Sequence, residues 1–109
     1  MTLKTPQRTA HVFSINHLAH FYRDVLQNEG RVTKKRIQWA KSERDLLALA
    51  LHDQHVGPIV AYILKATDAA IVYCEKQDTQ QAEAIVKAHA QADKLLIDFD
   101  KKLIAEDMR

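Results

Sequence analysis

The last third of the chain carries a long apolar stripe at helical spacing. Its members recur every three or four residues, at Ala82, Ile85, Ala92, Leu96, Phe99 and Leu103, with His89 as the one polar member of the row. This spacing predicts a helix from Thr79 to Glu106, about 40 Å long at a rise of about 1.5 Å per residue. Such a stripe must be covered by other helices, which constrains the chain to a helical bundle.

Composition favours helix in the rest of the chain as well. The 109 residues include only two glycines and two prolines, too few breakers for a fold made of many strands and turns. Asn28-Glu29-Gly30 and Gly57-Pro58 are the main breaks, and Thr33 is suited to cap a helix N-terminus. They predict three further helices, 10–27, 33–55 and 58–76. Short connections then predict a single all-α domain over residues 1–109, an up-down four-helix bundle whose third helix is the most buried.

Cysteine usage and hydropathy indicate a cytoplasmic protein. The one cysteine, Cys74, excludes an intrachain disulfide framework and fits a reducing compartment. No apolar run resembling a signal peptide follows the first residues. Residues 56–74 are apolar enough to test as a membrane span, but Lys65 and Asp68 cost about 5 to 7 kcal/mol at the bilayer centre against about 2 to 4 kcal/mol gained. We therefore expect no membrane contact.

Basic charge is concentrated in the first half of the chain. Residues 1–54 hold nine Lys and Arg against five acids, a balance of +4, whereas residues 55–109 hold seven against nine, a balance of −2. The densest cluster has no acid within it and surrounds Trp39; it comprises Arg31, Lys34, Lys35, Arg36 and Lys41. Such a cluster can steer an acidic protein partner, or grip nucleic-acid phosphates while Trp39 stacks on a base. The net charge of only +2 favours the protein partner.

The first helix has two apolar rows. Ile15, Leu18, Tyr22 and Val25 have core spacing, and a second row, rotated away from the first, comprises Phe13, His17 and Phe21. One bundle covers only part of so wide a face, unless the helix lies deep between its neighbours. Because aromatic side chains outside a core are enriched in interfaces, we predict that Phe13, His17, Phe21 and Trp39 contact a partner protein or a second copy in a homodimer.

The histidines do not form a recognisable metal site. His17 with His20, and His52 with His55, are each three residues apart, but antiparallel packing leaves the two pairs about 10 Å out of step, so that only a cluster of His11, His52 and His55 stays open. The chain contains no Glu-x-x-His of di-iron bundles and no His-x-x-Lys-Gly of histidine phosphotransfer domains. No nucleophile and base can be placed on one helix face. The sequence predicts no metal, no cofactor and no catalytic residue, and therefore a non-enzymatic interaction module.

Two residues of the predicted core carry reactive side chains. His89 lies in an apolar row, where an unpaired ring is costly to bury, so we expect it to have a hydrogen-bond partner. Cys74 lies on the apolar face of the third helix, and we expect a buried, inert thiol.

Overall fold

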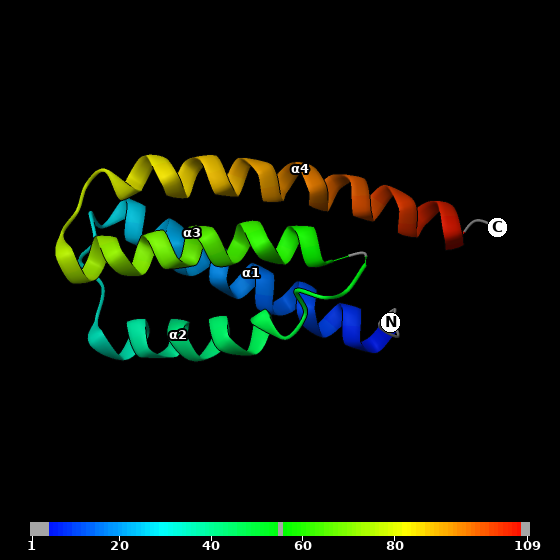
Figure 1. The fold of residues 1–109 in the computed structure, drawn as a ribbon, viewed down its shortest axis with the longest axis horizontal. Coiled ribbons are helices and arrows are strands. Elements are labelled where there is room, and N and C mark those ends of the chain that lie inside the picture. Colours follow the sequence, from blue (N-terminus) through cyan, green and yellow to red (C-terminus); the bar gives the residue numbers. More distant parts are fainter. Residues whose placement is uncertain (1–4, 55, 108–109) are drawn as a thin grey trace.

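The computed structural model is a bundle of four helices that alternate in direction (Figure 1). The structure describes residues 5–54 and 56–107, and side-chain surroundings for 14–54, 56–98 and 101. The helices are α1 (Thr5–Gln27), α2 (Lys34–Ala48), α3 (Gly57–Lys76) and α4 (Gln81–Asp107). The predicted all-α four-helix bundle is confirmed, and the described part of the chain contains no strand.

Helix α3 is the centre of the bundle. It packs against α1, α2 and α4, whereas α2 and α4 lie on opposite sides of the bundle and do not touch in the described part of the chain (Figure 1). Its side chains Ile59, Val60, Ile63 and Ala70 are buried, as expected for the most buried helix. By length and composition α3 could cross a membrane, and 56% of its most apolar stretch of 18 residues is buried inside the structure.

The turn between α1 and α2 forms as its residues require. Gly30 has a φ of +81°, which suits glycine, and its N–H donates to the Val25 carbonyl at 2.9 Å to close the end of α1. The Thr33 hydroxyl accepts from the Arg36 N–H at 3.2 Å, so the predicted N-cap of α2 is confirmed.

Helix α2 is shorter than predicted, because it ends at Ala48 rather than at His55, which lies outside the described residues. The next N–H groups, of Leu49 and Ala50, donate to carbonyls three residues back, which tightens the chain into turns. The Asp53 carboxylate then accepts from the Val56 N–H at 2.8 Å. These contacts end α2 where no glycine or proline marks a break.

The other helix ends differ from prediction by a few residues. Helix α1 begins at Thr5 rather than at residue 10, and α4 begins at Gln81 rather than Thr79. The Asp78 carboxylate accepts from the Gln80 N–H at 3.1 Å just before α4, so an acid precedes this helix and binds a free N–H near its start.

Candidate partner-binding surface

A groove of about 550 Å³ separates α1 from the start of α2, and it brings together residues that the sequence singled out for different reasons. His17 comes from the second row of α1, while Lys35, Arg36 and Trp39 come from the basic segment. We call this the α1–α2 groove; its lining comprises His17, His20, Thr33, Lys35, Arg36 and Trp39. Thr33 and His20 were not predicted to lie there.

The aromatic part of the groove is formed by His17 and Trp39. Their ring centroids are 6.3 Å apart and the rings are tilted by 53°, so each ring holds the other in a defined position. His17 and His20 are exposed, and the Trp39 side chain is 37% exposed. The groove therefore presents half-buried aromatic surface that a bound molecule can cover at little cost in side-chain entropy.

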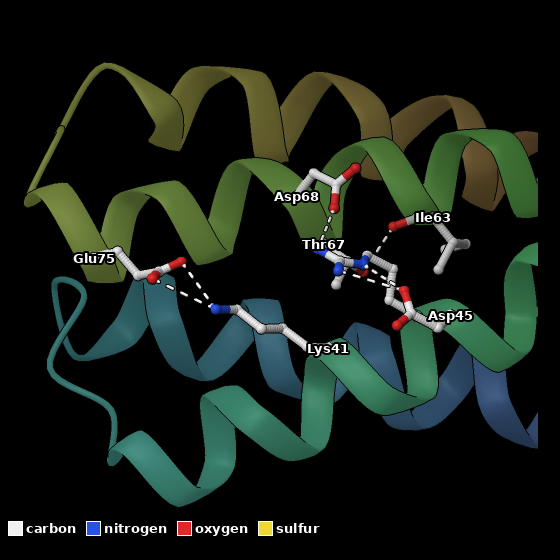
Figure 2. Close-up of polar contacts among 7 residues, drawn as sticks. Lys41, Asp45, Ile63, Thr67, Asp68 and Glu75 are labelled. Carbon is white, nitrogen blue, oxygen red and sulfur yellow. Dashed lines mark hydrogen bonds and ion pairs between the residues drawn. The ribbon is translucent and has the colours of Figure 1, made fainter.

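Three cations of α2 are paired with carboxylates from other helices. Arg36 pairs with Asp24 of α1 at 2.6 Å. Figure 2 shows Lys41 pointing toward Glu75 of α3, at 3.4 Å, and Arg44 pairs with Asp68 of α3 at 3.0 Å. The segment from residue 31 to residue 41 contains no acid, but the fold places carboxylates of α1 and α3 next to two of its cations.

The remaining cations of the basic segment have no carboxylate partner among the described residues. Arg31, Lys34 and Lys35 are exposed, and no carboxylate of residues 14–54 or 56–98 pairs with them. Lys35 lines the α1–α2 groove, while Arg31, Lys34 and Lys41 line a second hollow of about 530 Å³ against α3. The predicted basic segment thus divides over two neighbouring hollows, and three of its cations are unpaired within the part of the chain whose side chains the structure describes.

The aromatic row predicted on α1 is only partly present. Phe21 is fully buried among the core side chains of α1, so the prediction that it lies on an exposed row is wrong. Helix α1 contacts α2, α3 and α4, and this wide contact arc draws Phe21 into the core beside Leu18 and Val25. His17, one turn before Phe21, lies at the edge of that arc and stays exposed. The Phe13 side chain lies outside the described residues.

The outer side of α2 carries apolar surface that the sequence did not show to be exposed. Leu46 is 60% exposed and Leu49 is 78% exposed. Helix α2 contacts only α1 and α3, so these leucines have no neighbouring helix in the described part of the chain. The exposed leucines continue from Trp39 along the same side of the helix, so the apolar surface extends beyond the α1–α2 groove.

His89 has the hydrogen-bond partners that were expected. Arg23, which can only donate, donates to Nε2 at 3.3 Å. The ring proton therefore lies on Nδ1, which donates to the Tyr22 hydroxyl at 2.5 Å. Burial, and then the charge of Arg23, hold the pKa of His89 below its ordinary value of 6.5, while burial raises the pKa of Tyr22 to about 12. Tyr22, Arg23 and His89 thus form a polar contact between α1 and α4.

Cys74 has the features of a structural thiol. It is half-buried, and burial, followed by the charge of Glu75, raises its pKa, so thiolate is scarce at neutral pH. No group of three or more histidine, cysteine, aspartate or glutamate side chains that could hold a metal occurs among the described residues. The predicted His52 and His55 pair lies partly outside them, because His55 is not described.

No protein-family model, curated protein or solved structure matches this chain.

Proposed function

We propose that this chain is a small non-enzymatic interaction module that docks an acidic segment of another protein on the start of α2. The observation that carries the proposal is the α1–α2 groove, where exposed aromatic surface from His17 and Trp39 lies next to the free cation Lys35. Trp39 supplies buried contact area. Lys34, Lys35 and Arg31 supply attraction that steers the partner and speeds association.

Nucleic acid is the alternative ligand for the same surface, through phosphate contacts and stacking on Trp39. The ion pairs of Arg36 with Asp24 and of Lys41 with Glu75 weigh against it. Each pairs a cation of the basic segment with a carboxylate, which reduces the positive potential that nucleic acids require. A compact acidic segment needs only the free cations and the aromatic surface between them.

Affinity capture with charge-reversed variants tests the proposal. The purified full chain is used as bait in a lysate of its source organism, with and without nuclease, beside Lys34→Glu/Lys35→Glu. The control is Lys65→Glu/Lys94→Glu, which changes the net charge equally at exposed lysines of α3 and α4. We expect a protein that is retained by the wild type and the control, lost with the variant at 34 and 35, and unaffected by nuclease.

Two results would reject the proposal. Retention that is equal for all three baits would show that Lys34 and Lys35 do not contribute. Retention that nuclease abolishes would assign the surface to nucleic acid instead.

A further inference from the structure

The outer side of α2 has the side-chain spacing of a helix-packing seam. We define the α2 outer face as Lys35, Trp39, Ser42, Leu46 and Leu49, which follow one another in alternating steps of four and three residues. Side chains with this spacing form one row along a helix, the row that a second helix covers in a coiled-coil pair. The buried residues of α2, Ile37, Ala40 and Leu47, lie on the other side and serve the bundle core.

No helix of the bundle covers the C-terminal half of this face in the described part of the chain. Helix α4 does not contact α2. Trp39 packs against His17 of α1, whereas Leu46 and Leu49 are 60% and 78% exposed. The exposures of Leu46 and Leu49 are therefore a property of the fold, since both leucines lie in an ordered helix or its cap. Exposed apolar residues on α4 are different, because Val86 and Ile97 lie three turns apart with the charged Asp93 between them on the same side.

Charge is distributed unevenly along the α2 outer face. Lys35 lies on the face at its N-terminal end, next to Lys34 and Arg31, and none of the three pairs with a carboxylate of the described residues. The C-terminal end holds Leu46 and Leu49. A complementary surface is apolar opposite the leucines and carries carboxylates opposite Lys35.

The size of the face suits a single helix that binds reversibly. The face is about 21 Å long at about 1.5 Å per residue and about 10 Å wide. Its footprint of a few hundred Å² is below the roughly 800 Å² per partner that stable protein interfaces bury. An extended peptide finds no strand edge to pair with in the described part of the chain, whereas a helix can place its own apolar row between Trp39, Ser42 and Leu46.

We infer that the partner of this module is an amphipathic helix that packs along the α2 outer face, with its carboxylates at the end opposite Lys35. This inference rests on the proposed function and specifies the binding mode. Ser42, the small residue at the middle of the face, leaves room for a large apolar side chain of the partner, and Trp39 and Leu46 lie on either side of it.

A defined peptide tests the binding mode with the full chain. The probe is a labelled synthetic peptide of three heptads with leucine at the a and d positions and glutamates in one terminal heptad. A second peptide carries lysines in place of those glutamates. Each is used below the concentration at which it associates with itself, and fluorescence anisotropy gives its affinity. We expect the glutamate peptide to bind with a Kd of about 1 to 100 μM, and the lysine peptide to bind at least about tenfold more weakly.

Two sets of variants separate the binding mode from the proposed function. Leu46→Asp/Leu49→Asp should weaken the glutamate peptide at least about tenfold, whereas Val86→Asp/Ile97→Asp, matched in charge and exposure on α4, should change its affinity less than about twofold. Circular dichroism checks that both fold, as their exposed positions predict. If Lys34→Glu/Lys35→Glu weakens the peptide but the leucine variant does not, acidic docking stands and helix packing on the α2 outer face is rejected. If neither variant weakens binding, both are rejected.

Two further outcomes would overturn the inference. Light scattering that shows a wild-type dimer and a monomeric Leu46→Asp/Leu49→Asp variant would assign the face to a second copy of this chain. Displacement of the glutamate peptide by a single-stranded oligonucleotide at equal concentration would assign the surface to nucleic acid.

Discussion

Gly30→Ala tests the turn that places α2, and with it the α1–α2 groove. Gly30 has a φ of +81°, where an L side chain costs about 1 to 2 kcal/mol. A Cβ there would lie 2.5 Å from Cδ1 and 2.8 Å from Cε1 of Tyr73. Tyr73 is a buried core ring, so it cannot swing away, and such overpacking typically costs a further about 1 to 3 kcal/mol.

The expected net loss of unfolding free energy is about 1 to 4.5 kcal/mol, after allowing about 0.4 to 1 kcal/mol for the smaller entropy of the unfolded alanine chain. For a domain of this size the loss corresponds to a fall in Tm of about 4 to 18 °C. Chemical denaturation followed by circular dichroism measures it directly. The matched control is Glu29→Gly at the neighbouring exposed residue, whose φ is 54°. Because glycine relieves strain there, stability should be unchanged or raised by about 0.5 kcal/mol. A Gly30→Ala protein as stable as the wild type would refute both the turn geometry and the contact with Tyr73.

Three further predictions follow from individual contacts. The pKa of His89 lies below 6.5 in the folded protein, so the unfolded chain takes up the proton first and stability falls as the pH drops below about 6.5. Chemical denaturation between about pH 7 and about pH 5.5 should show a smaller loss of unfolding free energy for His89→Gln than for the wild type. Parallel pH profiles of the two proteins would contradict this. Asp24→Asn releases Arg36 from its ion pair, which should lower the unfolding free energy by at most about 1 kcal/mol because both groups are part-exposed. Anisotropy should show a severalfold higher affinity for the glutamate peptide. A lower affinity would show that Arg36 must be held by Asp24. Burial and the neighbouring Glu75 raise the pKa of Cys74. Iodoacetamide near pH 7 should therefore alkylate this thiol much more slowly in the folded protein than in denaturant. Equal rates would show an accessible thiolate.

The fold could be predicted from the sequence because its signals are local and agree with one another. The apolar row of α4, the cap at Thr33 and the break at Gly57-Pro58 each specify a helix or its end, and short connections leave few arrangements. The end of α2 could not be predicted in this way. It depends on contacts at Asp53 and on turns after Ala48. No glycine or proline at this point in the sequence marks the end of the helix.

The exposure of the candidate site residues could be predicted from the sequence only in part. Exposure depends on how many neighbours a helix acquires, which periodicity does not reveal. Phe21 is buried because α1 has three neighbours, and Leu46 is exposed because α2 has only two. Likewise, Arg36 and Lys41 look unpaired in the sequence, but Asp24 and Glu75 reach them from other helices. His17, Lys35 and Trp39, which the sequence singles out for different reasons, lie in one groove.

The central claim is that a protein partner covers the surface around Trp39, and one spectrum tests it directly. Trp39 is the only tryptophan of the chain, so the protein prepared with 5-fluorotryptophan has a single fluorine resonance. An unlabelled partner, or the glutamate peptide, adds no signal of its own. We predict that the resonance shifts or broadens on binding and that Lys34→Glu/Lys35→Glu suppresses the change. A complex that forms by light scattering while the Trp39 resonance stays unchanged would contradict the account.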